Sequence, residues 1–261
     1  MTRNQWIGAC LLIAIAFAAT VAPELGSNPY DQDLVRVAET PSLDYWLGTD
    51  HLGRDTAVRL AMGARYSLGI ATAAMGLALL IATPLGVLGG TIRPLGVVVR
   101  WVIDVVQSIP GFLITFLIAT SLAIGPVAIV VAIALTAWVE PCRLILLTTE
   151  AAVRGTYVEA ARLVGLPTKF VVGRLVLPTI LPALASVIGI AFAHAILAIA
   201  TLGFLGIGLR PPTPEWGTMI ADGMPYIHEA PQMILLPALA ILATVLGFLL
   251  LFGNTRGARW D

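Results

Sequence analysis

The residues best equipped for chemistry are four ionisable side chains inside long apolar runs: Asp104, Glu140, Arg143 and His194. An ionisable group at membrane depth usually lies against a pathway, a partner or another charge, because lipid does not solvate it. Arg100 stands one helical turn before Asp104, and this spacing favours an ion pair that anchors a helix end. Glu140 and Arg143 flank a proline and a cysteine, a pattern that indicates a kinked, packed helix end with the two charges paired.

His194 stands among small residues in AFAHAILAIA, which allow helices to pack closely. Such a lone histidine is usually a hydrogen-bonded packing residue, although a neutral imidazole also binds borderline metals such as nickel. No pair among His51, His194 and His228 has the spacing of a metal site. The two cysteines, Cys10 and Cys142, fall in apolar runs, where we expect buried thiols.

Enzyme chemistry is not indicated. An intramembrane hydrolase needs a nucleophile with a base, or paired carboxylates, at membrane depth. The available bases, Asp104, Glu140 and His194, lie in different apolar segments without a matching motif. No glycine-rich phosphate loop occurs, so any nucleotide is expected on another chain, and the net charge of zero offers no overall field to recruit nucleic acid.

These side chains must be positioned by an all-α chain that crosses a membrane. The sequence is 58% hydrophobic and 11% charged, whereas a soluble domain carries about 25% charged residues. A spanning helix takes about 20 apolar residues. We place six spans, at residues 5–23, 66–90, 100–122, 126–147, 180–206 and 232–253.

The basic residues indicate the orientation of the spans. With both termini in the cytoplasm, ten of the fifteen basic residues lie inside: Arg3, Arg93, Arg100, Arg143, Arg154, Arg162, Lys169, Arg174, Arg256 and Arg259. The remaining five lie outside: Arg36, Arg54, Arg59, Arg65 and Arg210. Because cytoplasmic loops carry the excess of Lys and Arg, both termini are expected inside.

The chain then divides into three parts. Residues 1–65 hold the first span and an external segment, residues 66–253 hold the membrane-spanning core with the cytoplasmic loop 148–178, and residues 254–261 form a short cytoplasmic tail. Met1 to Ala22 also has the look of a secretory signal, but its apolar run is longer than a usual signal core. A second external segment covers 209–231.

The longest cytoplasmic loop, 148–178, contains EAARLVGLPTKFVVGRLVLP from Glu159 to Pro178. The T-x-x-E spacing of Thr156 and Glu159 predicts a capping box, followed by a helix from Tyr157 to Val164. Tyr157, Ala160, Ala161 and Val164 would then share one face. Gly165 is placed to end the helix in a left-handed conformation. Thr168 is placed to cap a second amphipathic segment, Lys169 to Leu177.

Two uses of this segment remain open on periodicity alone. An amphipathic helix can lie on lipid headgroups, or it can dock on another protein. The small residues Ala160 and Ala161 favour docking, because they allow a partner's surface to approach closely.

Glu159-Ala160-Ala161, followed by Gly165 and Leu177-Pro178, resembles the EAA loop of bacterial ABC importer permeases. WLGTDHLGRD (Trp46 to Asp55) and PPTPEWGTMIADG (Pro211 to Gly223) are similar to the second permease subunit of dipeptide, oligopeptide and nickel importers. GARYSL, Ile109-Pro110 and FLGIG extend the similarity from Trp46 to about Leu250. The tail GNTRGARWD departs from the family's usual ending.

The resemblance implies a type I ABC importer permease fold in the bacterial cytoplasmic membrane, without enzyme activity. It implies a second permease subunit, two ATPase subunits that bind ATP and Mg²⁺, an external solute-binding protein and surrounding lipid. The cargo would be peptides or, as the alternative, nickel or a metal chelate. The ATPase-coupling residues would be Glu159, Ala160, Ala161, Gly165, Leu177 and Pro178. The translocation path would include His194, Asp104 and Arg143, and the binding-protein contacts would be Asp50, Arg54, Asp55, Glu215 and Trp216.

Overall fold

The computed structural model describes residues 2–26, 28–122, 125–167 and 170–253, and its long elements are all helices. The helices are α1 (Arg3–Leu25), α2 (Thr56–Thr91), α3 (Arg93–Gln107), α4 (Gly111–Ser121), α5 (Pro126–Ala137), α6 (Val139–Val153), α7 (Thr156–Leu163), α9 (Leu177–Phe204), α10 (Trp216–Gly223) and α11 (Gln232–Phe252). A π-helical segment, η1 (Val171–Val176), leads into α9, and a 3₁₀ turn, η2 (Met224–Tyr226), follows α10.

Five described helical stretches are long and apolar enough to cross a membrane, and a sixth is obtained if α3 and α4 count as one broken span. The axes of α3 and α4 differ by 84°. Pro110 disfavours helical geometry at Ile109 and directly precedes α4. The count of six is therefore confirmed with this reading, but the prediction of one continuous span over 100–122 is wrong.

The fourth span begins as predicted, with Pro126 in the first turn of α5, where a missing N–H costs nothing. It runs to Val153 and is interrupted at Trp138, which separates α5 from α6. Pro141 lies in the first turn of α6 and is tolerated there for the same reason. Glu140 thus occupies the start of a half-helix in mid-span.

Small residues bring the helices close together. A Cβ atom on Gly86 would lie 2.7 Å from the Ile145 side chain, and one on Gly90 would lie 2.5 Å from Thr149, so α2 and α6 pack backbone to side chain. A Cβ atom on Gly8 of α1 would lie 2.6 Å from the backbone nitrogen of Leu251, so α1 and α11 approach backbone to backbone. Cys142 is buried in this packing, whereas Cys10 is exposed on α1, so the expectation of two buried thiols is wrong for Cys10.

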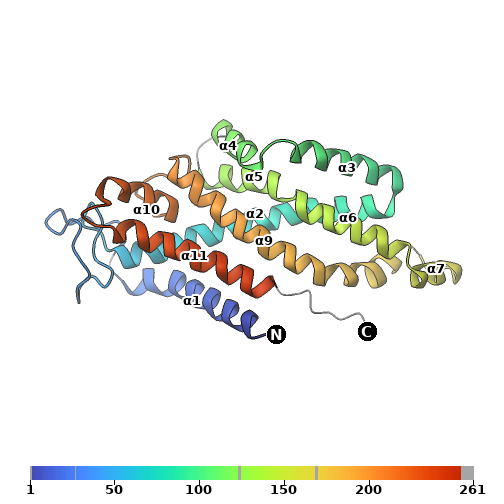
Figure 1. Cartoon of the computed structure of the whole chain (residues 1–261), viewed down its shortest axis with the longest axis horizontal. Helices are drawn as coiled ribbons and strands as arrows, with labels where there is room; N and C mark the ends of the chain where they lie inside the picture. The colour runs from blue at the N-terminus through green and yellow to red at the C-terminus, as the bar shows by residue number, and fades with distance from the viewer. Residues whose placement is uncertain (1, 27, 123–124, 168–169, 254–261) are drawn as a thin grey trace.

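The molecule is an elongated bundle with functional segments at its two ends (Figure 1). The middle helices α2, α5, α6 and α9 separate α3 and α4 on one long side from α1 on the other, with α11 between α9 and α1. Helix α7 projects from one end, and α10 lies at the opposite end with the loops that precede α2. The start of α1 and the end of α11 point towards the α7 end, as an even number of crossings requires.

Candidate functional site

The first candidate region is α7, which begins one residue earlier than a capping box would need. The Glu159 N–H donates to the carbonyl oxygen of Gly155, at 3.1 Å, so Gly155 is the residue that accepts the first intrahelical bond. Thr156 is already the first helical residue, and among the described residues its side chain makes no bond to Glu159. The predicted capping box is wrong, because the backbone of Gly155 provides the start instead.

The end of α7 follows the prediction. Gly165 has φ of +80°, the left-handed conformation that glycine adopts without steric cost. The Leu166 N–H bonds the Ala161 carbonyl oxygen at 3.1 Å and closes the last turn. The predicted cap at Thr168 and the start at Lys169 lie outside the described residues. From Val171 on, the expected second segment is π-helical and continuous with α9.

The two faces of α7 differ in what they contact. Val158 and Ala161 are buried against residues of α6 and η1, including Val171. The side chains of Leu163 and Val164 are 85% and 81% exposed. The prediction that Ala161 offers its small side chain to a partner is therefore wrong, since Ala161 packs against its own chain.

The other residues assigned to coupling remain accessible. Glu159 and Ala160 are exposed on α7, and Gly165 is exposed just beyond it. Leu177 and Pro178 are exposed in the first turn of α9, after η1. The accessible surface at this end of the molecule is thus partly charged and partly apolar.

The ionisable residues of the third and fourth spans pair across helices. Arg143 Nη2 lies 2.8 Å from Asp104 Oδ1, and Arg100 Nη1 lies 3.0 Å from Glu150 Oε2. The predicted Arg100–Asp104 and Glu140–Arg143 pairs are therefore wrong. Because α3 packs against α6, each arginine reaches a carboxylate on the facing helix rather than one on its own.

A cavity of about 640 Å³ lies between α4, the α5–α6 span and α9. His194 lines this cavity, together with Glu140 and three threonines, Thr115, Thr136 and Thr201. Asp104 and Arg143 line a separate hollow of about 260 Å³ beside α3. The three residues predicted for a translocation path are thus not brought together, and Glu140 takes the place of the other two beside His194.

The alternative role of His194 as a metal ligand would require further ligands beside it. Within the described ranges, no group of three or more His, Cys, Asp or Glu side chains is arranged to hold a metal ion.

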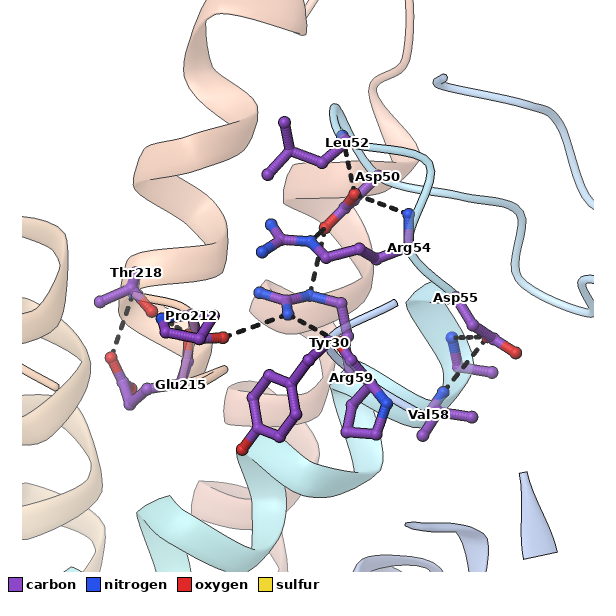
Figure 2. Close-up of polar contacts among 12 residues, drawn as sticks. Tyr30, Asp50, Leu52, Arg54, Asp55, Val58, Arg59, Pro212, Glu215 and Thr218 are labelled. Atoms are coloured by element: carbon purple, nitrogen blue, oxygen red, sulfur yellow. Dashed lines mark hydrogen bonds and ion pairs between the residues drawn. The ribbon is translucent and has the colours of Figure 1, made fainter. Parts of the chain in front are cut away.

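The third region is the end of the bundle opposite α7, called the outer end after its predicted orientation, where charged side chains are buried (Figure 1 and Figure 2). Asp50 Oδ2 accepts a hydrogen bond from Arg54 Nε at 2.6 Å. Arg59 Nε lies 3.1 Å from the same oxygen, as an ion pair whose angles are not those of a hydrogen bond. One carboxylate therefore faces two guanidinium groups inside the protein, and all three residues are buried.

Arg59 also ties the two external segments together. Its Nη1 donates to the carbonyl oxygen of Pro29 at 3.0 Å and to that of Pro212 at 3.3 Å. Figure 2 shows the contact between Arg59 and Pro212. Arg59 was not among the predicted site residues, although it follows GTDHLGRD by only four positions.

Glu215 starts α10 from a buried position. Its carboxylate accepts hydrogen bonds from the N–H groups of Gly217 and Thr218, at 2.8 and 3.1 Å. Burial raises the pKa of Glu215 to about 7, and the bonds from Gly217 and Thr218 oppose that rise. Trp216 is also buried and donates from Nε1 to the Leu60 carbonyl oxygen at 3.0 Å.

Four of the five residues predicted to contact the binding protein are therefore not on the surface, and the prediction is wrong for them. Asp50, Arg54, Glu215 and Trp216 are buried and bond within the chain. The fifth, Asp55, is half-buried and accepts from the N–H groups of Ala57 and Val58 as the N-cap of α2. This motif holds the outer end together instead of presenting its charges.

Comparison with known proteins shows which family the chain resembles. Residues 82–255 match the family described as binding-protein-dependent transport system inner membrane component. The glutathione transport system permease protein of Pectobacterium atrosepticum is 35% identical, over 95% of this chain and 82% of that protein. The di/tripeptide transport system permease protein of Pseudomonas aeruginosa is 34% identical, over 96% of this chain and 86% of that protein.

A solved structure shares the fold. A chain of the MetNI methionine ABC transporter, in an inward-facing conformation, matches with a TM-score of 0.59 and 20% identity. The match covers 77% of this chain and 96% of that one.

Proposed function

The chain belongs to the family of binding-protein-dependent transport system inner membrane components, and from this premise we propose that it carries small peptides across the membrane. It is a multi-pass inner-membrane permease of an ABC importer, with the fold of a transporter permease. It binds no cofactor itself, because ATP hydrolysis belongs to partner subunits. The full assembly comprises a second permease, two ATPases and an external binding protein.

The peptide cargo is supported by the relatives. The two relatives named above are permease proteins of a glutathione transport system and of a di/tripeptide transport system. A further relative, from Brucella suis, is a putative peptide transport system permease protein, 35% identical over 97% of this chain and 86% of that protein. Peptide cargo is therefore preferred to the nickel alternative, which these relatives do not support.

Helix α7 is the element that the ATPase subunit grips. The observation that supports this role is the exposure of Leu163 and Val164 beside the charged Glu159, at the far end of the bundle. Neighbouring apolar side chains that are both exposed are a common feature of interaction sites. A rigid grip also needs a fixed helix, which the buried contacts of Val158 and Ala161 provide.

Substitution of Leu163 tests the grip. Leu163→Asp should reach the membrane normally, because the side chain is exposed, but it should retain much less ATPase on purification of the complex. The matched control is Leu43→Asp, since Leu43 is 97% exposed in the external segment, at the opposite end from α7. Full retention of ATPase by Leu163→Asp would contradict the assignment and favour a helix that lies on lipid.

The orientation that goes with this role places both termini and α7 in the cytoplasm. Single cysteines at Leu43 and Leu163 should then differ in intact cells with a membrane-impermeant thiol reagent. The first should react from outside and the second only after the cells are opened. The opposite labelling pattern would reverse the topology.

A further inference from the structure

The cavity between α4, the α5–α6 span and α9 carries one formal charge among its lining residues. Its wall is apolar apart from three threonines, His194 and Glu140. Thr115 and Thr136 bond to each other at 3.0 Å, and Thr201 bonds the Leu197 carbonyl oxygen at 2.7 Å, so these hydroxyls already have partners. Glu140 is therefore the group that sets the charge of this cavity.

The neighbouring charges do not neutralise Glu140. Arg143 pairs with Asp104, and Arg100 pairs with Glu150, which also binds Arg154. The bond that Glu140 makes in the described structure comes from the neutral amide of Gln107, whose Nε2 lies 2.6 Å from Oε1. The arginine one turn away is thus occupied, and the carboxylate remains uncompensated.

An uncompensated carboxylate in mid-span calls for a cationic partner. Such a residue is costly in lipid and stands where water or a bound group solvates it. The cavity volume of about 640 Å³ lies within the range of about 300–1,000 Å³ that is common for small-ligand sites. A site of this size, mostly apolar with one carboxylate, fits an organic ammonium ion.

We propose that Glu140 binds the free α-ammonium group of the peptide while the cargo occupies this cavity. This assignment rests on the proposed transport of small peptides. Gln107, beside the break between α3 and α4, orients the carboxylate through its amide. Selection for a free amino terminus is therefore built into the membrane path of this chain.

The charge of the cavity is tested first, without cargo. In the complete complex, with Cys10 and Cys142 replaced by alanine, Thr201→Cys places a thiol on the cavity wall. Its reaction rates with aminoethyl and sulfonatoethyl methanethiosulfonate compare a cationic and an anionic probe of similar size. Adding Glu140→Gln should lower the cation-to-anion rate ratio by about tenfold, as expected for a unit charge within the same cavity.

The control for this measurement is Asp44→Asn, the same carboxylate-to-amide change in an exposed external position. It should leave the rate ratio unchanged. An unchanged ratio in the Glu140→Gln variant would show that the cavity charge comes from elsewhere and would overturn the proposal.

Cargo recognition is tested by protection of the same thiol. Dialanine should slow the reaction of Thr201→Cys, and the Glu140→Gln variant should need about tenfold more dialanine for equal protection. N-acetyl-dialanine, which lacks the ammonium group, should protect poorly. N-acetyl-lysine amide, whose ammonium group is on the side chain, should also protect poorly.

Equal protection by acetylated and free dialanine would overturn the role of the ammonium group, and equal protection by the lysine derivative would overturn the choice of the α-amine. ATPase retention is measured on the same preparations. If the complex retains its ATPase normally but dialanine does not protect the Thr201→Cys thiol, the cargo site is refuted and the permease assignment stands. The permease assignment is tested separately, by the loss of ATPase in the Leu163→Asp variant.

Discussion

At the outer end of the molecule charged side chains are buried and paired, whereas at α7 apolar side chains are exposed. Asp50, Arg54 and Arg59 form a closed cluster, and the Arg59 guanidinium also bonds backbone carbonyls of both segments predicted to be external. Leu163 and Val164, by contrast, contact little of their own chain. The outer end covers its charged groups with its own chain, while the α7 end leaves apolar side chains uncovered.

The polarity of a motif in the sequence does not indicate whether the motif is exposed. The charged sequences GTDHLGRD and EWGT predict contact surfaces, yet Asp50, Arg54 and Glu215 are buried. The EAA segment contains one acidic residue and looks less polar, yet it is the accessible segment. Burial of an ion pair is costly unless its geometry is good, so a buried cluster is sensitive to removal of one member.

The sharpest way to break the comparison is to remove Asp50. Asp50→Ala leaves Arg54 and Arg59 buried without their shared carboxylate, and loss of one partner of a buried pair costs about 3–5 kcal/mol. The cleavage rate by trypsin after Arg54 in the purified chain should rise more than a hundredfold, as this residue becomes accessible. Asp44→Ala, which removes an exposed partner of Arg36, should cost less than about 1 kcal/mol. Equal cleavage rates in the two variants would show that the cluster of Asp50, Arg54 and Arg59 does not hold the outer end in its folded form.

A second test uses the pH dependence of Glu215. Its pKa is raised from 4.5 to about 7 in the folded protein, so the folded state holds the proton more tightly than the unfolded state. Its contribution to stability is therefore fully present below pH 4.5 and is lost as the pH rises to about 7. The loss is about 3 kcal/mol, an order-of-magnitude figure from the shift.

Glu215→Gln should remove this dependence, because the amide does not titrate. Its single oxygen can accept only one of the bonds from Gly217 and Thr218, which the two carboxylate oxygens accept separately, so some stability is lost at every pH. The unfolding temperature, followed by tryptophan fluorescence, should then vary less between pH 4.5 and 7 than in the unsubstituted chain. Glu24→Gln, at an exposed carboxylate, is the control. An unchanged pH profile in Glu215→Gln would contradict the buried carboxyl as its source.

The packing of α10 provides a smaller effect. A Cβ atom on Gly217 would collide with the backbone of Ala200 in α9. Gly217→Ala should therefore destabilise the outer end by about 1–3 kcal/mol, the usual cost of overpacking. Gly69→Ala is the matched control, because no atom lies within 4 Å of a Cβ there. The changes in the free energy of unfolding in urea that the two substitutions cause should differ in sign or clearly in size. Equal changes would contradict the close contact of α9 and α10.

The smallest effect on stability is expected at the α7 end. Gly165 has φ of +80°, so Gly165→Val introduces a strain of about 1–2 kcal/mol into a turn that supports little else. Membrane insertion should persist, while ATPase retention and peptide uptake fall. Gly173→Ala, with open space around the new Cβ, should retain both activities. Normal uptake in Gly165→Val would remove this turn from the coupling mechanism.

Local rules were sufficient where a feature depends on neighbours in the sequence. The apolar runs predicted the spans, Pro126 predicted the start of α5, and Gly165 predicted the end of α7. In each case the deciding interaction reaches no further than about one turn of helix, or depends only on hydropathy over a continuous stretch.

The sequence by itself determined a six-span all-α permease with an accessible helical segment near residue 160. Only the tertiary structure decided which charges pair, since Arg143 reaches Asp104 over 39 positions and Arg100 reaches Glu150 over 50. It also decided that α3 and α4 meet at 84° and that Glu140 shares a cavity with His194. The physical reason is that a charged side chain takes its partner from whichever helix packs against it, and that choice depends on the packing of the whole bundle.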